Sequence, residues 1–133
     1  MLYYEHKHTR QGRDLIIGVD EAGRGPLAGP VVAAAVFLKT FRFSSRIDDS
    51  KKLSSDQRRT AYFELIEKSV FGIGLVNERV IDRINILEAT KLAMEQAVEG
   101  VLAQMRAYDA GRFQILVDGN VRFRSVLPVD AVV

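Results

Sequence analysis

The chain of 133 residues contains no cysteine and only three prolines. Without cysteine there is neither a disulfide framework nor a thiolate metal site, so carboxylates and the two histidines are the remaining candidates for metal ligands. No apolar run approaches the ~18 residues that a membrane-spanning helix needs. The first residues also lack the apolar segment of a signal peptide, and we therefore expect a cytoplasmic protein with no membrane partner.

The chain also lacks a large excess of either charge, because 19 basic and 17 acidic residues give a formal net charge of only +2 at pH 7. The basic residues nevertheless gather between Lys39 and Arg59, where seven of them accompany three acids. With a sequence pI near 9.0, such a cluster permits a polyanionic partner, although solvated loop and helix surfaces explain it as well. The length and the 47% content of hydrophobic residues fit a single domain over residues 1–133.

Short apolar runs bounded by turn residues predict the strands of a sheet. Residues 15–20 ("LIIGVD") and 29–38 ("GPVVAAAVFL") are separated by a short loop, which favours an antiparallel pair. Further strands are expected at 70–76, where two glycines weaken the pattern, at 113–120 ("FQILVDGN") and at 127–133 ("LPVDAVV").

Helices are predicted by capping residues and by apolar positions that recur on one face. Ser54 and Gln57 form a capping box before the first helix. Asn77 is expected to cap a short helix ("ERVIDRI"), and Asn85 with Glu88 to open the longest one. With the strands, these helices give a mixed α/β fold. The positions expected on the apolar faces are Ala61, Tyr62, Leu65 and Ile66 in the first helix, and Leu87, Met94, Val98, Val101 and Met105 in the last, which runs from Ile86 to about Arg106.

Two of the predicted strands end in an aspartate. Asp20 follows "IIGV", Asp118 follows "QILV", and a glycine comes within three residues of each. If these strands are parallel neighbours, the two carboxylates lie side by side, about 5 Å apart. Such a pair repels unless a cation lies between its members, and an all-oxygen site suits Mg²⁺ or Mn²⁺. Taken singly, each aspartate is equally well explained as a turn residue at a strand exit.

Glu21 is harder to place, because successive side chains of a strand point to opposite faces. It can face the same site as Asp20 only if the strand ends at about Asp20 and the turn brings Glu21 round, a bend that Gly23 and Gly25 would ease. Otherwise Glu21 is a solvated turn residue. The bare backbone there would also let a sugar or phosphate approach, with Arg24 pairing a phosphate, although a tight hairpin explains the same glycines.

The run "GVDEAGRGPLAGPVVAAAVF" resembles the signature of type 2 ribonuclease H, ribonuclease HII. The motifs "DDSKKLS", "INILEATKLAM" and "ILVDGN" follow in the order of that family, so the resemblance covers roughly residues 16–133. It implies a ribonuclease H-like mixed sheet with flanking helices. It also implies an endoribonuclease that hydrolyses the RNA strand of RNA–DNA hybrids, or cleaves 5′ to ribonucleotides embedded in DNA, and leaves a 5′-phosphate and a 3′-hydroxyl. The implied catalytic and metal-binding residues are Asp20, Glu21 and Asp118, with Mn²⁺ or Mg²⁺ as the cofactor.

The same resemblance implies a nucleic-acid-binding set. Gly23, Arg24 and Gly25 match the segment that contacts ribose 2′-hydroxyls at an RNA–DNA junction, largely through backbone, and this would explain why bare backbone follows the acids. Ser50 and Lys51 match positions that contact the nucleic-acid backbone. A serine and a lysine before a helix are usually solvated, so these two residues could equally be exposed surface residues that bind nothing.

The family's fourth metal-binding carboxylate, and a tyrosine that packs against the junction sugar, come later in the family than the last strand predicted here. Asp130, the only acid after Asp118, matches no family carboxylate. We therefore expect a C-terminally truncated version of the fold, with an apolar sheet face exposed and prone to self-association. Two hypotheses stay open: an endoribonuclease impaired by truncation, and a catalytically inactive nucleic-acid-binding fragment of the same fold. Another metal nuclease or transferase with a similar sheet is a weaker third.

Overall fold

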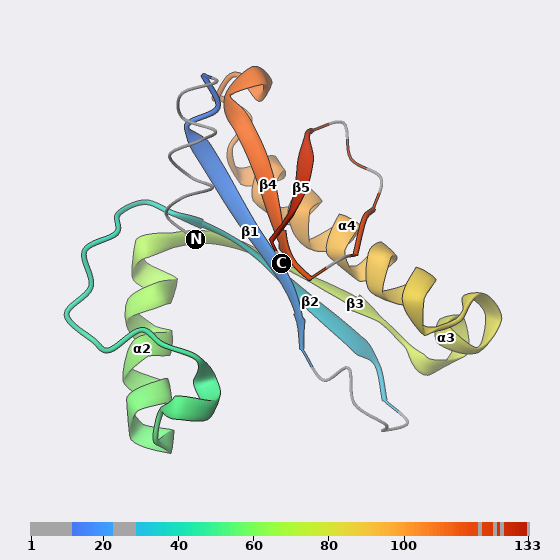
Figure 1. Cartoon of the computed structure of the whole chain (residues 1–133), viewed down its shortest axis with the longest axis horizontal. Coiled ribbons are helices and arrows are strands. Elements are labelled where there is room, and N and C mark those ends of the chain that lie inside the picture. The colour runs from blue at the N-terminus through green and yellow to red at the C-terminus, as the bar shows by residue number, and fades with distance from the viewer. Residues whose placement is uncertain (1–11, 23–28, 120, 124, 126, 133) are drawn as a thin grey trace.

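A computed structural model describes residues 12–22, 29–119, 121–123, 125 and 127–132 of the chain. The strands are β1 (Leu15–Ala22), β2 (Val31–Leu38), β3 (Ser69–Val76), β4 (Phe113–Asp118) and β5 (Val129–Val132), and the helices are η1 (Ser50–Lys52), α2 (Ser55–Lys68), α3 (Glu78–Ile84), α4 (Ile86–Gln104) and η2 (Ala110–Arg112). The five strands form one sheet in the order β3-β2-β1-β4-β5 (Figure 1).

The sheet is mixed, as the sequence predicted. β2 is antiparallel to both β1 and β3, which confirms the expected first pair, whereas β4 is parallel to both β1 and β5. One boundary differs from the prediction, because β1 continues past Asp20 to Ala22. The reason lies in the partner strand: Glu21 and Ala22 pair with Ala33 and Val32 of β2, so the ladder holds both residues in extended conformation.

The three predicted helix caps are confirmed. Ser54 and Gln57 form the reciprocal capping box at the start of α2, with distances of 3.1 Å and 2.9 Å between their paired atoms. The Asn77 side chain accepts the Val80 N–H at 3.1 Å at the start of α3. Asn85 accepts the Glu88 N–H at 3.0 Å and has a φ of 74°, a left-handed conformation that asparagine tolerates better than most residues.

Helix α4 covers one face of the sheet and closes the core (Figure 1). Most of its predicted stripe is buried, but Leu87 is 42% exposed because it lies in the first turn, where α4 begins beside α3. Among the described residues, no helix combines the length and apolar character that crossing a membrane requires. The core residues that α4 contributes are Ala89, Ala93, Met94, Ala97, Val98 and Val101, and the strands add Leu15, Ile17, Val19, Val31, Ala33, Ala35, Val76, Phe113, Ile115 and Val117.

The two glycines of β3 set the distance between this strand and α4. A β carbon on Gly72 would lie 2.1 Å from the carbonyl oxygen of Ala97, and one on Gly74 would lie 1.8 Å from the carbonyl oxygen of Ala93. Both distances are far below van der Waals contact, so only glycine permits this approach. The glycines that weaken the strand pattern in the sequence are therefore the residues that let the helix backbone rest on the sheet.

The predicted apolar face of α2 is wrong in part. Ala61 is buried, but Tyr62 and Ile66 are exposed, because α2 lies beside the sheet rather than over one of its faces (Figure 1). The buried charged residue of this helix is instead Glu64. Its carboxylate accepts hydrogen bonds from two backbone N–H groups of the preceding loop and from Lys68, and so fastens that loop to the helix.

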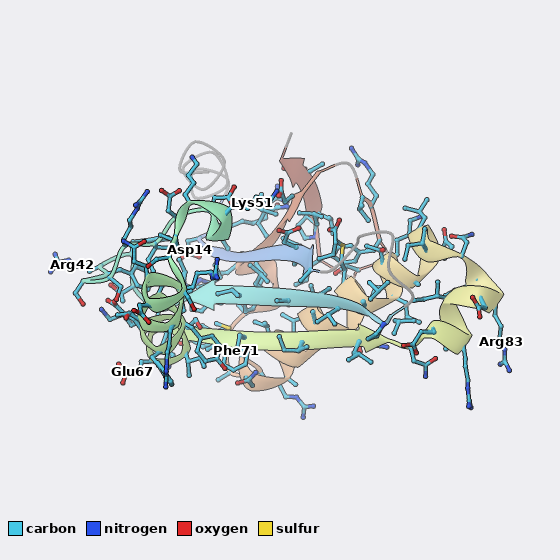
Figure 2. All side chains as sticks on the ribbon, turned by 90° about the horizontal axis from the view of Figure 1, so that it is seen from below. Asp14, Arg42, Lys51, Glu67, Phe71 and Arg83 are labelled. Carbon is cyan, nitrogen blue, oxygen red and sulfur yellow. The ribbon has the colours of Figure 1, made fainter. Side chains whose placement is uncertain are left out.

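The sheet face opposite α4 is apolar and open. Ile73 is 57% exposed and Leu75 54% exposed on this side of β3, and Phe71 is exposed beside them (Figure 2). The structure thus contains the exposed apolar sheet face that the sequence led us to expect. Exposed apolar surface of this kind is unusual on a folded domain and is typical of a surface that contacts other polypeptide.

Candidate functional site

Asp20 and Asp118 occupy equivalent positions on two neighbouring parallel strands. The paired positions of β1 and β4 reach Val19 and Val117, and the two aspartates follow directly. Neighbouring strands are ~4.8 Å apart, so the aspartate backbones lie side by side where both strands leave the sheet. The condition on which the sequence argument depended, that these strands are parallel neighbours, is met.

Both aspartates also belong to the open face of the sheet. Val19 and Val117 are buried in the core beneath α4, so the next residue on each strand faces the other way. Asp20 and Asp118 accordingly line a groove of about 590 Å³ on the open face. The groove runs along β1 over apolar side chains, which include Ile16, Val36 and Leu65, to Asp14 at its far end.

The surroundings of Asp20 shift the pKa of its carboxyl group. Partial burial, the largest cause, raises the pKa of Asp20 above its ordinary value, and the negative charges of Glu21 and Asp118 raise it further. The Glu21 N–H opposes the shift by donating to the Asp20 Oδ1 atom at 2.8 Å. Asp20 therefore lies close enough to Glu21 and Asp118 for their charges to oppose its ionisation, and a bound cation would relieve that opposition.

Glu21 does not share the face of the two aspartates. It lies within regular strand, paired with Ala33, and alternation directs its side chain to the side of the sheet that α4 covers. Its Oε2 atom is out of contact with solvent. The condition under which Glu21 could face the same site as Asp20, a strand that ends at about Asp20, is thus not met in this structure, because pairing with β2 extends the strand.

These positions limit what the described residues can hold. Within them, no group of three or more histidine, aspartate or glutamate side chains is arranged to bind a metal ion. Among the described acids, Asp20 and Asp118 are the two that supply hard oxygen ligands at this end of the open face, a donor set that fits a cation such as Mg²⁺ or Mn²⁺, which keeps several waters. Glu21 would join them only if the backbone at the end of β1 rotated and brought the Glu21 side chain to the face of the two aspartates.

The predicted nucleic-acid-binding residues fall in two groups. Gly23, Arg24 and Gly25 lie outside the described residues. Ser50 and Lys51 begin η1, where the Lys51 N–H donates to the Asp49 side chain at 3.0 Å. Lys51 does not belong to the lining of the groove, and Figure 2 shows it on the α2 side of the molecule.

One charged pair at the groove was missed by sequence reasoning. Arg112 donates to both carboxylate oxygens of Asp14, at 2.9 Å and 2.6 Å, and this pairing lowers the pKa of Asp14. Asp14 directly precedes β1 and Arg112 directly precedes β4, whose first residues pair in parallel register. The signal was in the sequence, because the predicted parallel pair places these two residues side by side at the opposite end from Asp20.

Comparison with known proteins assigns the family. The model of the family described as Ribonuclease HII matches residues 17–127. The chain is 54% identical over 101 residues to Ribonuclease HII of Bacillus pumilus, with 74% of this chain and 39% of the relative covered. It is 48% identical over 119 residues to Ribonuclease HII of Chlorobaculum parvum, with 86% of this chain and 54% of the relative covered. The chain thus spans about two fifths to one half of the length of these relatives.

Solved structures show the same fold at lower identity. A variant of Bst-RNase HIII superposes with a TM-score of 0.66 at 19% identity, covering 86% of this chain and 40% of that one. The RNase HII in a PCNA:RNase HII complex from Archaeoglobus fulgidus gives a TM-score of 0.56 at 21% identity, covering 88% of this chain and 61% of that one. The sequence match and the shared sheet agree, and the chain belongs to the ribonuclease HII family.

Proposed function

We propose that this chain carries the catalytic carboxylates of a ribonuclease HII and acts as a metal-dependent endoribonuclease. The single observation that supports the proposal most strongly is the placement of Asp20 and Asp118 at equivalent positions on β1 and β4, on the same open face. The proposed substrates are the RNA strand of RNA–DNA hybrids and ribonucleotides embedded in DNA. The proposed products carry a 5′-phosphate and a 3′-hydroxyl.

The roles of the residues follow from their chemistry. Asp20 and Asp118 would hold Mg²⁺ or Mn²⁺ between their carboxylates, and Glu21 would complete the set by turning toward them at the end of β1. Of two divalent ions at such a site, one would lower the pKa of a bound water and the second would stabilise the leaving 3′ oxygen. The raised pKa of Asp20 supports this assignment, because a bound cation would offset both partial burial, the larger cause, and the repulsion from the neighbouring acids.

Substrate recognition is proposed for the glycine–arginine segment and for the start of η1. The backbone at Gly23 and Gly25 would lie against the ribose, where the 2′-hydroxyl distinguishes RNA from DNA, and Arg24 would pair a phosphate. Ser50 and Lys51 would contact the nucleic-acid backbone from the α2 side. Charge neutralisation by these basic residues predicts binding that weakens as the salt concentration rises.

A cleavage assay tests the proposal. The chain is incubated with a labelled duplex that contains a single ribonucleotide, in Mg²⁺ or Mn²⁺, beside the variants Asp118→Asn and Asp82→Asn. Asp82 is exposed on α3 and provides a control with the same change of charge. Cleavage 5′ to the ribonucleotide that is lost in Asp118→Asn and kept in Asp82→Asn supports the enzyme. Cleavage that survives in Asp118→Asn contradicts it.

A second function has specific support. Pairing with β2 holds Glu21 in regular strand, and alternation directs its side chain away from the face that Asp20 and Asp118 share. This placement favours a catalytically inactive nucleic-acid-binding fragment. In the same assay, salt-sensitive binding of the duplex without cleavage in either metal would identify this function, and electrophoretic mobility of the duplex measures it.

Two further expectations belong with this proposal. The open apolar face suggests that the chain self-associates, or is less soluble than longer members of the family, and a monodisperse monomer in light scattering would contradict this. A cytoplasmic location also stays a prediction, which cell fractionation tests.

A further inference from the structure

The outer edge of β3 makes two contacts that have no part in the proposed catalysis. β3 is at the end of the strand order, so one side of its backbone has no neighbouring strand among the residues that the structure describes. On that side the Leu75 N–H donates to Gln96 Oε1 at 3.0 Å. The carbonyl oxygen of Phe71 accepts from Gln104 Nε2 at 2.8 Å, and the same amide group also donates to the Gly100 carbonyl of its own helix.

The two contacts depend on a match between helix and strand dimensions. Helix α4 runs opposite to β3, since Gly74 lies against Ala93 and Gly72 lies against Ala97. Gln96 and Gln104 are eight residues apart, a rise of ~12 Å along a helix. The backbone groups that they contact are four residues apart, which is ~13 Å along a strand. One helix face can therefore reach two outward backbone groups, provided that the helix lies as close as the glycines allow.

The edge that these glutamines contact is otherwise suited to strand addition. Backbone groups of an antiparallel strand point alternately toward and away from the neighbour, so Phe71, Ile73 and Leu75 direct theirs outward. The same three side chains are apolar and exposed on the open face. An outward backbone beside exposed apolar side chains is a template for pairing with another strand.

We infer that Gln96 and Gln104 hold the β3 edge closed against strand addition by a second copy of this chain. The amides occupy a donor and an acceptor that a partner strand would need. The expected partner is β3 of the second copy, because antiparallel pairing of two identical edges is self-complementary about a two-fold axis. Each glutamine acts by competing for a backbone hydrogen bond while the helix packing stays in place.

A double variant, Gln96→Met with Gln104→Met, tests the inference. Methionine keeps the length and helix propensity of glutamine but lacks the amide. Hydrogen exchange at the Leu75 amide should become about tenfold faster at low protein concentration, and self-association in sedimentation velocity should tighten about tenfold relative to the parent chain. Glu99→Met is the control, since it adds the same side chain to an exposed position of α4 away from the β3 edge.

A second pair of changes identifies the surface through which the variant associates. Ile73→Pro, added to the double variant, blocks an outward N–H without removing a hydrogen bond to β2, whereas Ile73→Ser removes the apolar side chain and keeps the N–H. Reversal by proline but not by serine supports the inference. Parent-like association of the double variant, or association that proline leaves unchanged, overturns it. If circular dichroism shows the double variant to be unfolded, Gln104→Glu alone replaces it, because a carboxylate cannot donate to the Phe71 carbonyl.

Discussion

Replacing Gly74 by alanine should destabilise the fold far more than its size suggests. The added β carbon would lie 1.8 Å from the Ala93 oxygen and 2.6 Å from its carbonyl carbon, where ordinary contact begins at 3.4 Å. Both are backbone atoms, so no rotamer change relieves the overlap and α4 must move away from β3. This movement opens the packing between α4 and β3, and we expect the free energy of unfolding to fall by about 3 kcal/mol. The midpoint of thermal unfolding should fall by about 10 °C.

Gly18→Ala is the matched control for this prediction. Gly18 lies in the middle of β1 and a β carbon there meets nothing within 4 Å. Alanine restricts the unfolded chain more than glycine does, so this variant should change stability by no more than about 1 kcal/mol, in the stabilising direction. Urea denaturation followed by circular dichroism measures both variants. Equal effects at the two positions would refute the argument that close contact with α4, rather than strand propensity, fixes the glycines of β3.

Three further changes have defined outcomes. Hydrogen bonds from Lys68, Ser44 and Ser45 hold the pKa of Glu64 well below the ordinary value of 4.5. The ionised Glu64 side chain therefore stabilises the folded state above pH 4.5, and this stabilisation is lost as the pH falls toward the lowered pKa. Glu64→Gln should therefore lower the unfolding midpoint at pH 7, and this effect should shrink progressively as the pH falls below 4.5 while remaining measurable at a pH of about 3. An effect that does not change with pH would contradict this. Asp118→Asn should lower the pKa of Asp20 only part of the way to its ordinary value, because burial is the larger cause; carboxyl-carbon NMR titration in EDTA measures this, and an unchanged pKa would show that the two charges do not interact. Phe41→Ser, which removes an exposed aromatic ring from the groove, should reduce self-association in light scattering, and an unchanged mass would exclude this part of the open face as the interface.

Local signals account for the parts of the fold that the sequence predicted. The caps at Ser54, Asn77 and Asn85 depend on hydrogen bonds within three residues, and the structure forms all three. The strands depend on short apolar runs, and each appears within a few residues of its expected bounds. The adjacency of Asp20 and Asp118 needed one further step, the parallel pairing of their strands, which mixed α/β order favours.

The features that the sequence did not predict depend on contacts between elements. The apolar spacing in α2 predicted a buried face, yet a helix that lies beside the sheet has no surface against which to bury it, and Tyr62 stays exposed. In β3 the two glycines lower the strand propensity that the sequence shows. Their structural role, close contact with the backbone of α4, depends on a neighbouring element and so cannot be predicted from the strand alone. A local pattern gives the face that an element could bury, but the neighbouring element decides whether that face is buried.

Glu21 shows the same limit at the candidate site itself. The apolar run predicts a strand that ends at about Asp20, and only with that end could Glu21 face the same site as Asp20. Strand length is set instead by the partner, and β2 offers Ala33 and Val32 to continue the ladder for two more residues. Glu21 is consequently held on the α4 side by backbone hydrogen bonding that does not depend on its carboxylate. For Glu21 to bind a metal beside Asp20, the free energy of that ligation must exceed the cost of releasing the last paired residues of β1.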